Sequence, residues 1–429
     1  MNRRSKTSGR YGAKLIPCVL VLLLALVVTP AARADDICSI DQRPAATLLL
    51  PYFEVDPSDA AGLTTLFSVN NASAASILAN VVVWTDLGVP TVSFQIYLTG
   101  YDVQTVNLRD VFNGFLVGTA SAGQDPQDTI SPKGVFSQDL NFASCSGLLP
   151  YPRLPDTFVT HLRAAHSGQF SGLLNGCAGQ NLNDGRLRGY VTVDTVGACT
   201  QKIPSDPGYF GPGGVATNQN VLWGDYIYID TINKYSDGEN LVRIKAFPGA
   251  FGPGTPTFYG RYGTAGADAR QALPTVWASR YVNGGAFSGG TDVVVWRDSQ
   301  RTDGPFPCGT TPPGYPLRSI GEGIFDEEEQ LVTMGTYPVD PGAPPPPHPA
   351  PAAANRIHIG GTTFPVPFSF GWLFLDLRTP QALPVVSWGQ SWVETILKAQ
   401  GRYSVGFNAT PLNSGCDPTV AEPTLIWVP

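Results

Sequence analysis

The sequence predicts an all-β protein made of two tandem, internally duplicated β-sandwich domains, with loop-rich insertions held by disulfides. Three observations predict this class. Glycine and proline, 47 and 39 of the 429 residues, interrupt the chain at short intervals. The apolar segments between them are short and rich in Val, Ile, Thr, Tyr and Phe, which favour strands. Several of these segments also occur twice in the same order.

Residues 1–34 are predicted to be a secretory signal peptide. Five basic residues precede or begin an apolar run from Leu15 to Val28, and Ala32-Arg33-Ala34 has the small residues of a cleavage site. The run is shorter than the ~20 residues that a bilayer span needs. We therefore expect export to the periplasm, the cell surface or the medium, with no integral membrane span after cleavage. An uncleaved anchor is the alternative.

The exported chain is expected to be acidic. Six of the 27 Lys and Arg lie in residues 1–34 and none of the 34 Asp and Glu do, so 21 basic residues remain and the net charge becomes −13. A surface this negative does not attract phosphate backbones, so nucleic acid is not expected as a partner, whereas a protein or glycan partner is. Charged residues, at 14% against a usual ~25%, also exclude a coiled coil or helical bundle.

The cysteines that follow the leader are predicted to form three disulfides. Their even number, without a C-x-x-C pair or a histidine at ligand spacing, favours disulfides over a zinc site in an exported chain. The connectivity is open. We prefer Cys308–Cys416 and Cys145–Cys177, because each pair stays within one predicted domain. The six residues are Cys38, Cys145, Cys177, Cys199, Cys308 and Cys416.

The strands are predicted from apolar segments bounded by turn residues. In Phe94–Leu98 polar and apolar residues alternate, as on a half-buried sheet, whereas Val81–Trp84 is apolar throughout, as in a strand covered on both faces. Short strands with frequent turns are typical of sandwiches. The segments are Leu63–Val69, Ile77–Trp84, Thr91–Leu98, Tyr190–Thr195, Tyr226–Ile229, Val293–Trp296 and Trp372–Leu375.

Four pairs of segments recur in one order and indicate an internal duplication. We predict one β-domain at residues 45–250 and a second at residues 270–429, joined by Phe247–Gly266. Tryptophans at corresponding positions of the two copies are explained more simply by the needs of the fold than by catalysis. We therefore assign four tryptophans to cores: Trp84, Trp296, Trp223 and Trp388. The pairs are Phe67–Asp86 with Arg280–Asp298, Gly189–Asp194 with Gly371–Asp376, Trp223–Lys234 with Trp388–Lys398, and Val242–Ala246 with Val405–Ala409.

The two copies differ in their insertions. Copy one carries an excursion at about residues 114–185, predicted to be a loop held by Cys145 and Cys177. Copy two carries the Pro-rich residues 341–354, predicted to be an extended polyproline or mobile loop, with a linker between domains as the alternative. The helical spacing of Trp392, Val393, Ile396 and Leu397 predicts a helical turn in one copy, where the other looks extended.

No motif predicts a catalytic site. The chain lacks a Gly-x-Ser-x-Gly elbow, an H-E-x-x-H pair and a P-loop. His161 and His166 lie five residues apart and are interpreted as loop histidines, not metal ligands. We assign no catalytic, cofactor-binding or metal-binding residue, and an enzyme is not favoured.

Two acidic clusters are interpreted as solvated faces, with Ca²⁺ binding as the alternative. The first is Asp225, Asp230, Asp237 and Glu239, and the second is Asp326–Glu329. Ca²⁺ takes 6–8 oxygen ligands, but neither cluster matches the D-x-[DN]-x-[DN]-G loop. Paired carboxylates and tryptophan platforms would also suit a protein that acts on sugars.

Three function classes remain. The leading hypothesis is a secreted, non-enzymatic surface or envelope protein that acts in binding or scaffolding. The alternatives are an extracellular carbohydrate-binding or carbohydrate-active protein, and a periplasmic or pilus-type assembly subunit. In general terms the predicted architecture resembles immunoglobulin-like sandwiches, but a fold does not fix a function.

Overall fold

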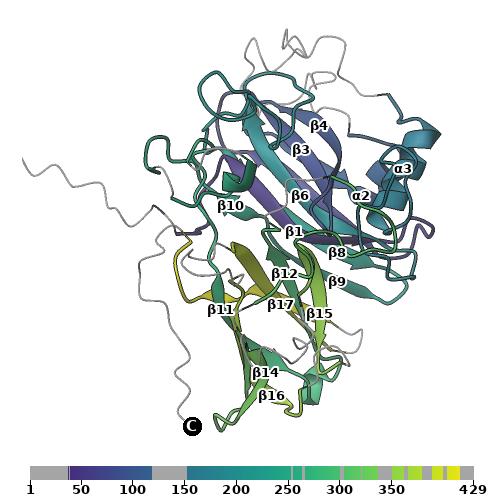
Figure 1. Ribbon diagram of the computed structural model, residues 1–429, viewed down its shortest axis with the longest axis vertical. Coiled ribbons are helices and arrows are strands. Elements are labelled where there is room, and N and C mark those ends of the chain that lie inside the picture. Colours follow the sequence, from purple (N-terminus) through teal and green to yellow (C-terminus); the bar gives the residue numbers. More distant parts are fainter. Residues whose placement is uncertain are drawn as a thin grey trace, which may run out of the picture.

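The computed structural model confirms the all-β class (Figure 1). Its named strands form four antiparallel sheets, two in each half of the chain. Each of the seven predicted strand segments lies in a strand, except that Leu63 precedes β2 by one residue. The structure describes residues 37, 39–117, 152–252, 255–262, 266–299, 304–319, 321–336, 350–361, 366–378, 389–399 and 403–415.

The first half forms two sheets, in the upper part of Figure 1. Both β1 and β3 are buried along their whole lengths, which explains why their sequences are mostly apolar. The larger sheet has the order β10 (Val242–Ile244), β1 (Thr47–Val55), β6 (Leu187–Val196), β3 (Ile77–Thr85) and β4 (Pro90–Leu98). The other has the order β5 (Val103–Asn107), β2 (Thr64–Asn71), β8 (Asp225–Asp230) and β9 (Tyr235–Asn240), with β7 (Leu222–Trp223) paired to β2.

Two helices pack against the sheets of the first half. They are α2 (Leu108–Phe112) and α3 (Asp156–His166). The ring of Phe53 in β1 lies 5.7 Å from that of Phe112 and 5.5 Å from that of His166. Part of the predicted loop excursion is therefore a helix with a buried face, and its residues 118–151 lie outside the described residues.

The second half also forms two sheets. The order of one is β14 (Leu331–Thr336), β13 (Gly321–Phe325), β16 (Phe370–Asp376), β11 (Val276–Val282) and β19 (Thr410–Pro411). The order of the other is β15 (Ala354–Ile359), β12 (Thr291–Arg297), β17 (Ser391–Lys398) and β18 (Ser404–Asn408). Short 3₁₀ turns occur at Gly260–Tyr262 and Gly285–Phe287.

The helical turn predicted around Trp392 is wrong, because this segment is strand β17. It lies between β12 and β18, and Ser391–Leu397 is buried throughout. A strand covered on both faces needs no alternation of polar and apolar residues, so the spacing of the apolar residues in this segment resembled that of a helix. In the Pro-rich segment, Ala354 begins β15 and Ala350, Ala352 and Ala353 are buried; residues 341–349 lie outside the described residues.

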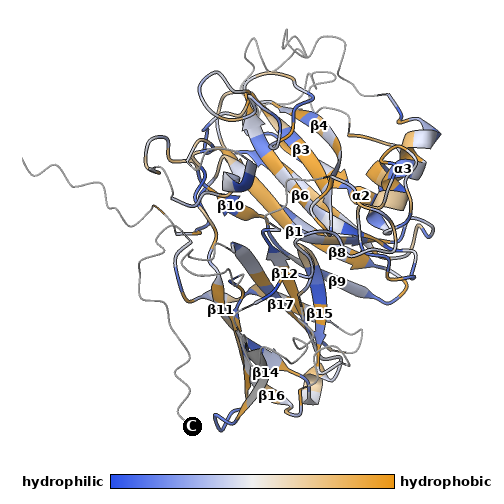
Figure 2. Ribbon diagram, in the orientation of Figure 1, coloured by the Kyte–Doolittle hydropathy of each residue, from blue (hydrophilic) through white to orange (hydrophobic). Residues whose placement is uncertain are grey.

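One continuous apolar core joins the two halves. Hydrophobic residues, orange in Figure 2, follow the central strands of both. Trp84 of β3 stacks on Tyr190 of β6 with ring centroids 5.8 Å apart, and Trp296 of β12 meets the same ring edge-on at 5.9 Å. The connection between the halves belongs to this core too, since Phe258 and Tyr259 are buried within it.

The internal duplication is not confirmed and stays a prediction. Trp84 and Trp296 are both buried near the ends of their strands, as predicted. However, Gly189 pairs with Thr85 in the sheet of Trp84, whereas Gly371 pairs with Tyr281 in the sheet that lacks Trp296. The immunoglobulin-like strand order likewise stays a prediction.

The core assignment of Trp223 is wrong. Trp223 is 37% exposed, because β7 is a two-residue strand in which Leu222 bridges to Ala45 while Trp223 pairs only with Asn70 at the end of β2. Trp388 lies outside the described residues.

Candidate functional site: a charged cleft between the halves

A cleft of about 370 Å³ lies where the two halves meet. The first half contributes the end of β1, the segment before β6 and the turn between β8 and β9. The second half contributes β15, the end of β17 and the segment before β18. The lining residues are Glu54, Leu63, Arg186, Asp230, Asn233, Lys234, Tyr235, Arg356, Lys398 and Tyr403.

The turn between β8 and β9 presents Lys234 to the cleft. Asp230 accepts hydrogen bonds from the backbone N–H of Asn233 at 3.0 Å and from its side-chain Nδ2 at 2.8 Å. Such Asx turns stabilise tight reversals. Lys234 follows in the left-handed region, with φ of 51°. Lys234 is exposed, and no described residue accepts a hydrogen bond from its Nζ.

Two arginines neutralise the carboxylate of Glu54. Arg186 Nη1 and Arg188 Nη2 each donate to Glu54 Oε1 at 2.9 Å, and the Tyr52 hydroxyl donates to Oε2 at 3.2 Å. Glu54 is buried, but the side chain of Arg186 is 37% exposed. Arg186 therefore keeps donors on the cleft side that the ion pair does not use.

Asp292 of β12 anchors the cations of the other wall. It accepts hydrogen bonds from Arg356 Nε at 2.8 Å, His358 Nδ1 at 2.9 Å and Lys398 Nζ at 2.6 Å. The strand register explains this grouping, because Asp292 lies opposite His358 in β15 and Arg356 lies two residues away on the same face. Burial would raise the pKa of Asp292, but the hydrogen bond from His358 and the charges of Arg356 and Lys398 hold it well below its usual range.

Arg356 joins the two halves across the cleft. Its guanidinium lies 5.8 Å from the ring centroid of Tyr228 and 5.5 Å from that of Tyr235, both in the first half. Nη2 donates to the Tyr235 hydroxyl at 3.2 Å. Although burial disfavours its charge, Tyr235 and Asp292 hold the pKa of Arg356 well above its ordinary value. Arg356 is therefore a fixed cation.

The lining carries four cations and two carboxylates, and the nearby Asp292 pairs with two of the cations, so an excess of one positive charge remains. The cleft is thus a locally positive site in a chain whose net charge is −7. In a partly buried cleft such an excess attracts anions more strongly than it does on an open surface. The arrangement suits binding, because Glu54, Arg356 and Lys398 are held in place before a ligand arrives.

The residues of the first predicted acidic cluster do not converge. Asp225 accepts a hydrogen bond from Ser68 Oγ at 2.7 Å, and Asp230 belongs to the cleft turn. Asp237 lies against Gly406, and Glu239 accepts from Asn408 Nδ2 at 3.2 Å, so both face β18. In the second cluster, Asp326 binds the backbone of its own turn while Glu327, Glu328 and Glu329 are exposed. Within the described residues, no group of three or more His, Cys, Asp or Glu is placed to hold a metal ion.

The interpretation of His161 and His166 as loop residues is wrong, since both lie in α3. His166 is buried; its Nε2 lies 2.8 Å from Thr91 Oγ1 and its Nδ1 lies 2.8 Å from the carbonyl oxygen of Arg188. Burial lowers the pKa of His166 to about 3, so its imidazole is neutral. His161 Nδ1 lies 2.7 Å from Ser171 Oγ, and both residues are buried. These contacts fix α3 to the sheet.

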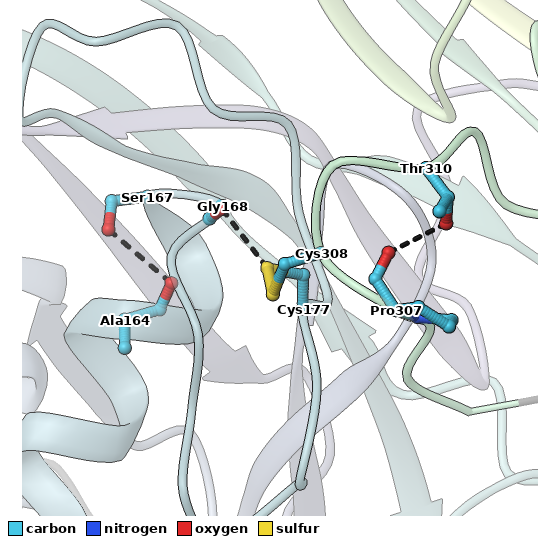
Figure 3. Close-up of a disulfide and its surroundings, with 7 residues drawn as sticks. All are labelled: Ala164, Ser167, Gly168, Cys177, Pro307, Cys308 and Thr310. Atoms are coloured by element: carbon cyan, nitrogen blue, oxygen red, sulfur yellow. Dashed lines mark hydrogen bonds between the residues drawn. A yellow bond between two sulfur atoms is a disulfide. The ribbon is translucent and has the colours of Figure 1, made fainter.

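A disulfide between Cys177 and Cys308 joins the halves at a second place (Figure 3). The preferred pairs Cys145–Cys177 and Cys308–Cys416 are therefore wrong. The prediction failed because it kept each pair within one half, whereas Cys177 and Phe306 exchange two backbone hydrogen bonds across the junction. Cys199 is also disulfide-bonded. Cys38, Cys145 and Cys416 lie outside the described residues.

A second cavity of about 480 Å³ lies beside this disulfide. The loops that carry Cys177 and Cys308 both line it, together with Gln180, Asn181 and Tyr315. It contains no charged residue. Two further contacts near the disulfide are drawn in Figure 3. The Sγ of Cys177 lies 3.4 Å from the carbonyl oxygen of Gly168, and the Thr310 hydroxyl donates to the carbonyl oxygen of Pro307 at 2.6 Å.

Sequence reasoning missed Arg186, Arg356, Lys398 and Asp292. Each is isolated in the sequence, and only the packing of the two halves brings them together. No protein-family model, curated protein or solved structure matches the chain. In the part of the chain that the structure describes, no helix is long and apolar enough to cross a membrane.

Proposed function

We propose that this chain is an exported, non-enzymatic binding protein whose ligand site is the cleft between its halves. The proposal combines the predicted signal peptide and disulfides with the cleft. One observation carries it: three charged side chains of the lining are already held by partners, Glu54 by two arginines, and Arg356 and Lys398 by Asp292. A ligand therefore pays little to order them.

The size and composition of the cleft support this use. Its volume of about 370 Å³ falls within the roughly 300–1,000 Å³ of small-molecule sites. Tyr403 is 51% exposed at its edge and Tyr235 lies within it, so the cleft offers aromatic faces as well as charges. Aromatic walls with polar groups also suit a sugar, which connects the site to the carbohydrate-binding alternative.

Export is tested by the N-terminal sequence of the secreted product. Cleavage after Ala34 gives a product that begins at Asp35. A membrane-bound product that still begins at Met1 contradicts export.

Binding is tested with a panel of extracellular mono- and disaccharides, neutral and acidic, by titration calorimetry on the mature protein. Ligands of the cleft should bind at least tenfold more weakly to Tyr403→Ala, which removes an exposed wall. Phe170→Ala is the matched control, because Phe170 is 60% exposed and is not part of the lining. The proposal is overturned if no panel member binds, or if every ligand binds both variants equally.

A further inference from the structure

From the spare donors of the cleft we infer that its ligand is a carboxylate-bearing saccharide of one or two rings. This inference rests on the proposed function and adds the ligand's chemical class. It depends on which charged groups of the lining are already satisfied and which are not.

The carboxylates of the lining already accept hydrogen bonds from neighbouring residues. Glu54 accepts from two arginines and a tyrosine, and Asp230 accepts twice from Asn233 within its own turn. The nearby Asp292 accepts from three donors. At Glu54 and Asp292 a cationic ligand would therefore have to compete with cations that are already bound, whereas an anion would not.

The cations of the lining, in contrast, retain free donors. Lys234 has no acceptor among the described residues, and Arg186 uses only Nη1 in its ion pair. Arg356 uses Nε and Nη2 toward Asp292 and Tyr235, which leaves Nη1 without an acceptor among the described residues. These three cations surround one cavity from both halves. A carboxylate, which accepts up to four hydrogen bonds, matches several such donors at once.

The remaining lining is suited to a sugar ring. Tyr403 and Tyr235 provide aromatic surface for the apolar face of the ring, and Asn233 provides an exposed amide for its hydroxyls. The volume accommodates a ligand of small-molecule size but not a long polymer segment held along its full length.

The experiment compares two disaccharides that differ in the carboxylates alone, α-1,4-digalacturonate and α-1,4-galactobiose, by titration calorimetry. We expect digalacturonate to bind at least tenfold more tightly, and to weaken as NaCl is raised. Lys234→Gln should weaken digalacturonate binding roughly fivefold, as expected for the loss of one solvent-exposed ion pair, without affecting galactobiose. Arg153→Gln is the matched control, since Arg153 is an exposed cation outside the lining. Inorganic phosphate serves as a competitor.

The outcomes separate the two proposals. If galactobiose binds as tightly as digalacturonate and both are weakened by Tyr403→Ala, the carboxylate inference is wrong and the binding cleft stands. If inorganic phosphate displaces digalacturonate at equal concentration, the site recognises anions in general and the saccharide part of the inference is wrong. If neither disaccharide binds the wild type, this inference is wrong, and the wider panel decides whether the cleft binds any ligand. If they bind but Tyr403→Ala changes neither, both proposals fail.

Discussion

The ring of Tyr190 in β6 lies edge-on to Trp296 in β12, with centroids 5.9 Å apart and planes at 75°. The two residues belong to different halves of the chain, and both are buried. The same Tyr190 ring stacks on Trp84 at 5.8 Å. The tryptophans that mark the two predicted copies therefore share one aromatic cluster, and neither half has a core that is closed without the other.

The shared core predicts that Trp296→Ala destabilises the whole chain. Removing a buried Trp side chain costs about 3–5 kcal/mol. We expect both halves to unfold in a single calorimetric transition, and we expect the temperature of that transition to be lower in the variant than in the wild type. Trp372→Ala is the control, because Trp372 is 36% exposed and should cost clearly less. Two transitions, of which only one shifts in Trp296→Ala, would show that the halves are independent.

The junction of the halves also contains a buried acid. Tyr226 of β8 donates a hydrogen bond to Glu394 of β17, and Asp237 and Glu239 of β9 lie nearby. Burial raises the pKa of Glu394 to about 8, which Tyr226 and Arg356 oppose only in part. Burial also raises the pKa of Asp237 to about 6. Both acids are thus more easily protonated in the folded chain than in the unfolded chain.

The raised pKa of Glu394 predicts that stability falls as the pH rises. In the unfolded chain Glu394 titrates near 4.5, so between pH 4.5 and about 8 the folded state holds a proton that the unfolded state has lost. The stability that protonation of Glu394 gives the folded state is complete below pH 4.5 and is lost as the pH rises through about 8. Glu394→Gln should therefore show a smaller drop in melting temperature between pH 5 and pH 9 than the wild type.

The control for this measurement is Glu327→Gln, which neutralises an exposed carboxylate. It should retain the pH dependence of the wild type. An unchanged drop in Glu394→Gln would mean that Glu394 is ionised in the folded protein at neutral pH.

The disulfide between Cys177 and Cys308 gives a third prediction. The bond closes a separation of 131 residues, and the chain-entropy model assigns a loop of that length about 5 kcal/mol. The double variant Cys177→Ser with Cys308→Ser should melt at a markedly lower temperature while keeping its strand content. Peptide mapping of the unreduced protein checks the pairing directly, and a Cys145–Cys177 peptide would disprove it.

The strands were predictable because their signal is local. Leu63–Val69 and Ile77–Trp84 are apolar segments bounded by turn residues, and they became β2 and β3. Trp392 was misread for a related reason, since a strand buried on both faces loses the alternation that distinguishes it from a helix. Helix α3, which carries His161 and His166, begins directly after Pro155 inside an excursion that was expected to be a loop.

The cleft was not predictable, because no local pattern encodes it. Arg186, Lys234 and Arg356 belong to three separate segments, and only the register of β12 with β15 and the packing of β9 beside β18 bring them to one cavity. The pairing of Cys177 with Cys308 was missed for the same reason. The cleft and this disulfide both depend on contact between the halves. Because the sequence was interpreted as two separate domains, no such contact was expected.

We propose that the two halves together form a cleft that binds a carboxylated ligand. The most direct measurement is a crystal structure of the mature protein soaked with α-1,4-digalacturonate. We expect a carboxylate within hydrogen-bonding distance of Lys234 Nζ or the Arg186 guanidinium, with Arg356 still bound to Asp292. A saccharide bound only elsewhere, or halves that lie apart with Arg356 far from Tyr235, would contradict it.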